Sequence, residues 1–319
     1  MYPNVAVVIP FFQRERGLLH RAVSSVLSQK DSPAISIVIV DDGSPVSARD
    51  DLGDLASHPQ ILLLQQENGG AALARNTALD HVLPSTDIVA FLDSDDWWSP
   101  VHLEKIVAAF NAGAEFYFCD YTRDERTTTF QVTTPELFSI EPFRKDIGIA
   151  WLDRPMFDLV IGKCPLAPST CAYSWSKGKR VRFDSAFRRS CEDRKFFAGL
   201  SMNITKVAFS TNCDVHYGIG VNIFGSAIWG TIAGAERVLD TARFHLGMSR
   251  CNLSDDQRAL NDIAIVSLDR EFAENVSVST LRAHQFPFGL VSEYANLRPG
   301  IWTVLGSVAI RLAWKRIAG

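Results

Sequence analysis

The feature that most constrains the fold is the regular alternation of short apolar runs with amphipathic segments through the first part of the chain. Continuous apolar runs of this length, bounded by turn residues, are typical of parallel strands buried on both faces. Between the first two runs, Leu19, Val23 and Val26 share one face of a helix. The runs are residues 5–10, 61–64 and 88–92, together with residues 35–40 and 114–119, which contain Ser36 and Glu115 respectively. The alternation predicts an α/β domain in which helices cover both faces of a mostly parallel sheet.

The composition narrows the class of protein. The chain has 319 residues, of which 47% are hydrophobic and 21% charged, as expected of a globular protein with a sizeable core. Its net charge of −4 gives no support for a nucleic-acid partner. The six cysteines form no C-x-x-C pair, which argues against a disulfide framework and fits a reducing cytoplasm. The first residues lack the basic leader and long apolar run of a signal peptide, so we expect a cytoplasmic protein.

Side chains suited to binding follow three of the predicted strands. Phe12 follows the first strand, Asp41 and Asp42 the second, and residues 93–96 the fourth. In open α/β sheets ligands bind outside the carboxyl ends of the strands. We therefore expect these residues to converge on one site at that edge of the sheet.

The stretch IVAFLDSDDWWSP runs from a buried strand directly into Asp93, Asp95 and Asp96. Neighbouring carboxylates repel one another, so a positive group is expected nearby, and a divalent cation is the obvious candidate. Alternate side chains leaving a strand point the same way, so Asp93 and Asp95 can share one hard cation such as Mg²⁺ or Mn²⁺. The alternative is a surface turn that caps the next helix, which we expect to begin with Ser99 as its N-cap. The position directly after a buried strand favours the metal site.

Two further polar residues have alternative interpretations. Asp42 is placed to hydrogen-bond a nucleotide base or ribose, or else to form an Asx turn before Gly43. Arg75, on the helix after the third strand, is placed to pair with a phosphate or to form a surface salt bridge.

Four motifs in order, VVIPFFQRERGLLHRAVSSVLSQ, IVIVDDGS, NGGAALARNTAL and FLDSDDWW, resemble the nucleotide-binding half of family 2 glycosyltransferases. That family has the GT-A fold and is inverting and metal-dependent. RFDSAFRRSCEDRKFFAGL resembles its "ED" motif and gives Glu192 and Asp193, where the aspartate would be the catalytic base. GIGVNIFGS, residues 218–226, resembles bacterial exopolysaccharide glycosyltransferases, among them the succinoglycan glucosyltransferases of rhizobia.

The resemblance implies a role for each site residue. Asp193 would take a proton from the acceptor hydroxyl, although a carboxylate there also suits a helix N-terminus. His216 would be either a metal ligand or a structural histidine beside Tyr217. Of Trp97 and Trp98, we expect one to face the cleft and stack on a sugar. The expected set is Pro10, Phe12, Asp42, Arg75, Asp93 and Ser94 for the donor nucleotide, Asp95, Asp96 and His216 for Mn²⁺ or Mg²⁺, Asp193 for catalysis, and Glu192 and Trp97 in support.

The same resemblance implies the substrates. The donor would be a UDP-sugar, with UDP-glucose as the first choice, and the product would carry a β-linkage. The acceptor would be a polyprenyl-diphosphate-linked oligosaccharide at the inner face of the plasma membrane. Residues 301–314 are apolar but too short to span a bilayer, and Arg311, Lys315 and Arg316 lie in or after them. This segment is either an interfacial amphipathic helix or a helix packed on the protein's own core.

Other functions fit less well. A sugar-nucleotide nucleotidyltransferase needs a glycine-rich loop after the first strand, and PFFQRERG is not one. A Rossmann dehydrogenase needs G-x-G-x-x-G at the same place, and this motif is absent there. A transferase-like scaffold without activity stays open. We expect a nucleotide-sugar-binding half at residues 1–125, an acceptor half at 126–245 and a helical region at 246–319.

Overall fold

The computed structural model of the chain describes residues 3–30, 33–122, 127–218 and 228–318. It divides into two compact units, one formed by residues 1–185 and 192–221 and the other by residues 186–191 and 222–319. The second unit begins earlier in the chain than the helical region predicted from residue 246. The reason is that α10 (Ile232–Met248) packs its apolar face on α11 (Asp255–Ala283).

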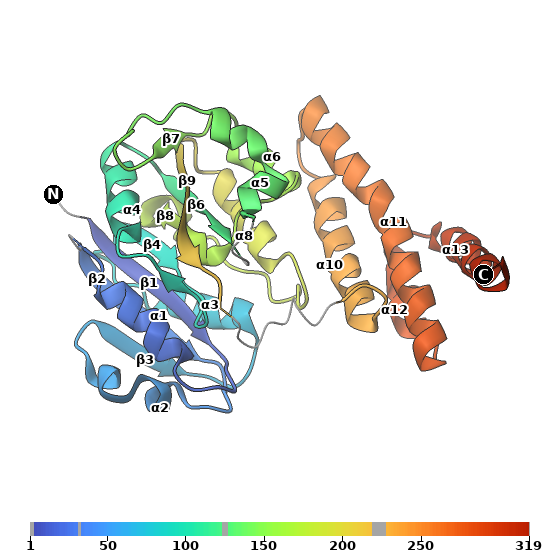
Figure 1. Cartoon of the computed structure of the whole chain (residues 1–319), viewed down its shortest axis with the longest axis horizontal. Coiled ribbons are helices and arrows are strands. Elements are labelled where there is room, and N and C mark those ends of the chain that lie inside the picture. The colour runs from blue at the N-terminus through green and yellow to red at the C-terminus, as the bar shows by residue number, and fades with distance from the viewer. Residues whose placement is uncertain (1–2, 31–32, 123–126, 219–227, 319) are drawn as a thin grey trace. The chain divides into compact units, whose positions relative to one another are not determined.

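The first unit is built on one sheet, which has nine strands in the described residues (Figure 1). Its path is β3-β2-β1-β4-β8-β6-β9-β5, with β7 paired to β9. The first four strands are parallel, as are β6 and β9, whereas β5, β7 and β8 pair antiparallel. The bounds are β1 Asn4–Phe11, β2 Ala34–Asp41, β3 Ile61–Gln65, β4 Ile88–Phe91, β5 Trp97–Trp98, β6 Phe116–Thr122, β7 Ile149–Trp151, β8 Cys171–Ser174 and β9 Val207–His216. The predicted α/β class with a helix-flanked, mostly parallel sheet is confirmed.

Helices cover both faces of this sheet because successive strand side chains point to opposite faces. Val5, Val7 and Ile9 of β1 share one core cluster with α1 and α4. On the other face, Phe91 of β4 packs edge-on against Phe196 of α8. The helices of this unit are α1 Leu18–Leu27, α2 Ala48–Leu52, α3 Ala71–Asp80, α4 His102–Asn111, α5 Thr129–Thr133, α6 Met156–Ile161, α7 Trp175–Gly178 and α8 Glu192–Ser201, with short 3₁₀ turns η1 Gly53–Ser57, η2 Pro135–Ser139 and η3 Pro168–Thr170.

The predicted N-cap of α4 is wrong. The helix begins at His102 after Val101, and Ser99 lies outside it. The hydroxyl of Ser99 instead donates to Asp214 Oδ1 at 3.2 Å, so a partner on β9 replaces the local capping interaction.

The second unit consists of helices, completed by α12 (Phe288–Leu297) and α13 (Ile301–Ala318). The side chains of Ile301, Leu305 and Val308, spaced along one face of α13, are buried in the core of this unit. That face of α13 therefore packs on the protein's own core, which was one of the two expectations for this segment. In the described residues, no helix combines the length and hydropathy needed to cross a membrane.

Candidate functional site

The loop between β4 and β5 carries the three aspartates at the carboxyl end of a parallel strand. Asp93 and Asp95 are partly exposed, whereas Ser94 and Asp96 are buried. The buried hydroxyl of Ser169, on η3, accepts the backbone N–H of Asp93 at 2.9 Å and donates to Asp96 Oδ2 at 2.6 Å. Ser169 therefore connects the first and last aspartates of the loop.

Asp93 and Asp96 both have close partners within the chain. Arg75 of α3 is buried, and its Nη2 lies 2.6 Å from Asp93 Oδ1. Asp96 accepts the backbone N–H of Gly218 at 2.9 Å, in addition to Ser169. Burial, with the charges of Asp93 and Asp95, raises the pKa of Asp96 to about 8, and the hydrogen bonds from Ser169 and Gly218 oppose this rise. The positive group expected beside the aspartates is thus, at Asp93, an arginine.

Arg75 also joins this loop to the second acidic motif, about a hundred residues away in the chain. Its Nη1 lies 3.7 Å from Glu192 Oε1 at the start of α8. Burial, then the charge of Asp193, raises the pKa of Glu192 to about 7, and the charge of Arg75 opposes this rise. The structure therefore brings Asp93, Glu192 and Asp193 around one buried guanidinium. Burial lowers the pKa of Arg75, but the charges of these three carboxylates outweigh it, and the pKa is raised.

Asp193, the predicted base, lies in the first turn of α8. Its Oδ1 accepts the backbone N–H of Arg194 at 2.6 Å, in the first turn of α8. Burial raises the pKa of Asp193 above its ordinary value, although the Arg194 N–H and the charges of Arg75 and Arg194 act in the opposite direction. A carboxylate with a raised pKa accepts a proton more readily near neutral pH.

Asp42 is buried and holds the chain that precedes α3. Its carboxylate accepts the side-chain amide of Gln66 at 2.7 Å and the backbone N–H groups of Gly69 and Gly70, both at 2.8 Å. The local bond between a side chain and the backbone of this turn is made by its neighbour Asp41, whose Oδ1 accepts the N–H of Ser44, three residues on, at 2.8 Å.

The remaining donor residues lie near the same edge, and their contacts with a nucleotide stay predictions. Pro10 is buried and Phe12 is half-buried.

Trp97 and His216 meet side by side across β5 and β9. Their rings stack with centroids 5.1 Å apart and planes at 12°, and Trp98 is buried with its Nε1 donating to Ser169. Of the two tryptophans, Trp97 is thus the partly exposed one. A metal-ligand role for His216 stays a prediction, as does the role of residues 219–226, which lie outside the described residues.

Sequence reasoning missed three residues of this region. Ser169 and Arg21 contact the aspartate loop from distant segments, and Gly218 packs directly on it. Neither Ser169 nor Arg21 stands in a local pattern that marks it. Gly218 opens the motif at residues 218–226, and only its close approach to the Asp95 backbone explains why a glycine stands there.

The donor set suits a hard cation. Carboxylate oxygens of partly exposed side chains at alternate positions are typical ligands of Mn²⁺ or Mg²⁺. Asp95, with Asp93 beside it, would hold the ion.

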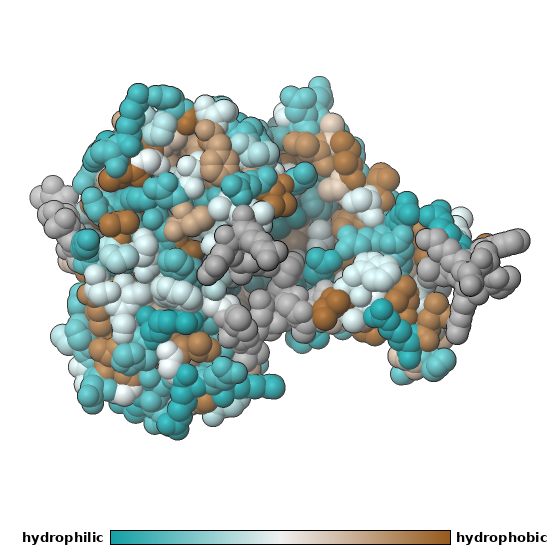
Figure 2. All heavy atoms as spheres, viewed as in Figure 1, coloured by the Kyte–Doolittle hydropathy of each residue, from teal (hydrophilic) through white to brown (hydrophobic). Residues whose placement is uncertain are grey.

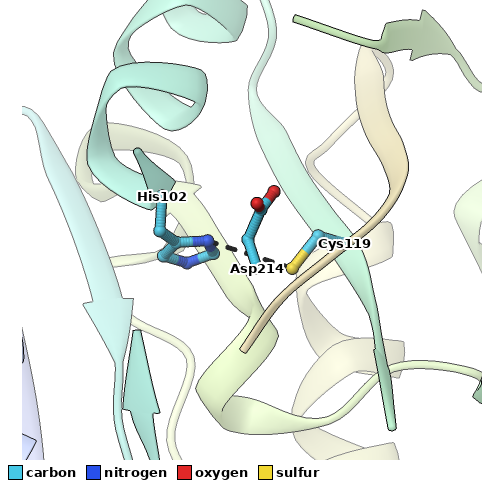
Figure 3. A group of neighbouring side chains, drawn as sticks. All are labelled: His102, Cys119 and Asp214. Carbon is cyan, nitrogen blue, oxygen red and sulfur yellow. Dashed lines mark hydrogen bonds between the residues drawn. The ribbon is translucent and has the colours of Figure 1, made fainter. Parts of the chain in front are cut away.

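A second polar cluster lies in the core of the first unit and has a different character (Figure 3). His102 Nδ1 lies 3.9 Å from Cys119 Sγ, and both approach Asp214. Lys105 Nζ lies 2.7 Å from Asp214 Oδ2, so an ammonium already balances that carboxylate. Burial raises the pKa of the Cys119 thiol well above its ordinary value, which keeps it neutral. We interpret this cluster as a buried structural network.

This network predicts a pH dependence of stability. Burial lowers the pKa of His102 from 6.5 to about 4. The unfolded chain takes up a proton as the pH falls below 6.5, and the folded chain does so only near 4. Stability should therefore fall between these values, by roughly 3 kcal/mol for this one group. Urea unfolding at pH 7 and pH 4.5 would measure it, and the variant His102→Gln should lose this part of the slope. Equal slopes in both proteins would contradict the assignment.

Comparisons with known proteins agree with this geometry. Residues 6–167 match the sequence profile described as Glycosyl transferase family 2. The succinoglycan biosynthesis protein ExoW of Rhizobium meliloti (strain 1021) is 31% identical over 242 residues, which are 70% of this chain and 71% of ExoW. The putative teichuronic acid biosynthesis glycosyltransferase TuaG of Bacillus subtilis (strain 168) is 39% identical over 32% of this chain and 40% of its own.

Two solved structures share the fold at low identity. The S. aureus TarS 1–349 structure in complex with UDP-GlcNAc has a TM-score of 0.60 at 16% identity, covering 95% of this chain and 81% of that one. The mannosyltransferase PcManGT from Pyrobaculum calidifontis, in complex with GDP-Man and Mn²⁺, has a TM-score of 0.56 at 17% identity, covering 99% and 88%.

Proposed function

Because the chain belongs to glycosyltransferase family 2, we propose that it transfers a hexose from a UDP-sugar, with UDP-glucose as the first choice, to a lipid-linked oligosaccharide. The single observation that carries the proposal is the joining of two acidic motifs by one buried arginine. Arg75 lies 2.6 Å from Asp93 and 3.7 Å from Glu192, so a donor-side loop and a candidate base are held side by side.

The proposed chemistry follows from these positions. Asp193 accepts the proton of an acceptor hydroxyl, and the oxygen attacks the anomeric carbon from the face opposite the departing diphosphate. The new C–O bond forms as the bond to the diphosphate oxygen breaks, so an α-linked donor gives a β-linked product. When bound, Mn²⁺ or Mg²⁺ would supply charge stabilisation for the departing diphosphate. The positive charge of Arg75 offsets the repulsion between the carboxylates of the two motifs.

Three findings on relatives support the choice of substrates. TarS and PcManGT have been solved with UDP-GlcNAc and with GDP-Man and Mn²⁺, which favours a nucleotide-sugar donor and a divalent ion. The similarity to ExoW, a succinoglycan biosynthesis protein, favours exopolysaccharide synthesis.

A panel assay tests the proposal. UDP release would be measured from UDP-glucose, UDP-galactose and UDP-GlcNAc, with Mn²⁺ and a synthetic polyprenyl-diphosphate glucoside as acceptor. We expect acceptor-dependent release from one donor. Binding of donors without any transfer would favour the non-catalytic scaffold, and release of pyrophosphate from UTP and a sugar phosphate would favour a nucleotidyltransferase.

We further propose that the acceptor is met at the cytoplasmic face of the membrane, through the exposed face of α13. Trp302 and Ile310 are 51% and 62% exposed there, Arg311 is exposed, and the helix contains no acidic residue. An apolar and basic face of this kind suits anionic lipid. Figure 2 shows hydrophobic residues in brown among polar ones on the surface of the helical unit.

Vesicle sedimentation checks the membrane contact. The protein should sediment with phosphatidylglycerol vesicles and not with phosphatidylcholine vesicles, and Ile310→Glu should abolish this. Ile263→Glu is the matched control, because Ile263 is 71% exposed on α11. Equal sedimentation of the two variants would contradict a role for α13.

A further inference from the structure

Arg21 of α1 reaches the aspartate loop from outside the two acidic motifs. Its Nη2 donates to the backbone carbonyl of Asp95 at 2.7 Å. Its guanidinium carbon lies 3.9 Å from the centroid of the Trp97 ring, which is the distance of a cation–π contact. One side chain therefore holds both the peptide of Asp95 and the aromatic residue two positions later.

The end of β9 meets the same peptide. His216 pairs with Trp97 and stacks on its ring. At Gly218, a Cβ atom would lie 1.7 Å from the Asp95 carbonyl oxygen and 3.0 Å from Arg21 Nη2. Only glycine allows this approach, so α1, β5 and the segment after β9 converge on the carbonyl of Asp95.

We propose that Arg21 is a positioning residue for the metal-binding carboxylate. The inference rests on the proposed function, in which Asp95 is that carboxylate. A charge-assisted hydrogen bond to its carbonyl and a cation–π contact with Trp97 fix the backbone of a residue whose side chain is partly exposed. Arg21 would influence the metal site indirectly, by holding the backbone of Asp95, because its guanidinium donates to the Asp95 carbonyl. Neither the acceptor proton nor the scissile bond requires it.

Replacing Arg21 should have the effect of removing a residue that hydrogen-bonds to a metal ligand without touching the metal. Loss of such a partner typically lowers metal affinity by about 10–100-fold. Arg21→Ala should therefore weaken Mn²⁺ binding by about that factor and raise the Mn²⁺ concentration needed for half-maximal rate. Arg21→Lys keeps a positive N–H donor but loses the broad guanidinium contact with the Trp97 ring, so it should recover part of the affinity.

The experiment follows free Mn²⁺ by electron paramagnetic resonance while the ion is titrated into each protein with saturating UDP. His20→Ala is the matched control, because His20 is an exposed neighbour on the same helix. The proposal predicts weak binding in Arg21→Ala, intermediate binding in Arg21→Lys and wild-type binding in His20→Ala, at unchanged melting temperatures.

Two results overturn the proposal in distinguishable ways. In the first, the wild type binds Mn²⁺ and Arg21→Ala binds it equally well. The same conclusion follows if binding by Arg21→Ala weakens only in proportion to a fall in melting temperature, and Arg21→Lys does not restore it. Either outcome overturns the role of Arg21 alone. Absence of Mn²⁺ binding in folded wild type overturns the metal role of Asp95, and with it this inference.

Discussion

Replacing Asp193 by asparagine should lower the turnover number by about 10²–10⁴-fold, the range for loss of a general base. The amide oxygen can still accept the Arg194 N–H that Asp193 accepts at 2.6 Å, so the first turn of α8 should be kept. UDP affinity should stay unchanged, because Asp193 acts on the acceptor. Steady-state kinetics with a UDP-sugar and acceptor would measure the loss, and calorimetry would measure UDP binding.

The pH profile gives this prediction a second readout. Because burial raises the pKa of Asp193, the base becomes protonated, and kcat/KM falls, at a pH above the ordinary range of an aspartate. That acidic limb should disappear from the residual activity of Asp193→Asn. The matched control is Asp184→Asn. It removes an ion pair with Lys195, which lies on α8 like Asp193, and this pair is partly exposed to solvent. A comparable loss of turnover in both variants would argue that the helix is disturbed and that Asp193 is not the base.

Replacing Asp95 by alanine should abolish stimulation by Mn²⁺ and lower the rate by about 10²–10³-fold, because an ion in this place is worth several kcal/mol of charge stabilisation. The loop should survive the change. Arg75 still pairs with Asp93, and the contact made by Arg21 is to the backbone carbonyl of Asp95. The rate as a function of Mn²⁺ concentration would measure the effect.

Asp96→Asn is the control that separates metal binding from loop packing. Both oxygens of Asp96 accept hydrogen bonds from the chain, one from Ser169 and one from Gly218. This variant should therefore lower the melting temperature and leave the Mn²⁺ dependence in place. The reverse pattern, with Mn²⁺ dependence lost in Asp96→Asn and kept in Asp95→Ala, would assign the ion to Asp96.

Much of the fold was predictable because its signals are local. The runs that became β1 and β4 are apolar throughout and buried, and only Ser36 interrupts the buried run of β2, so parallel strands could be predicted from them. The run of β3 was expected to be buried as well, but β3 lies at the edge of the sheet and its residues are partly buried or exposed. β5 gave no such signal. It consists of Trp97 and Trp98 alone, and only pairing with β9, more than a hundred residues later, makes it a strand.

The site was predictable in its acidic members and not in what neutralises them. Asp93 and Asp95 follow a strand directly, and Asp193 stands in a short motif at the start of a helix. Arg75 was expected at the nucleotide, whereas its recorded partners are Asp93 and Glu192. Ser169 reaches the loop from η3. These pairings depend on which segments the fold brings together, and no local spacing encodes them.

Calorimetric titration of UDP into the purified protein, with Mn²⁺ and again with EDTA, tests the central claim most directly. The account predicts binding in Mn²⁺, loss of binding in EDTA, and loss in Asp95→Ala with Mn²⁺ present. A folded wild-type sample that binds no UDP under either condition would contradict the assignment of this chain to UDP-sugar transfer.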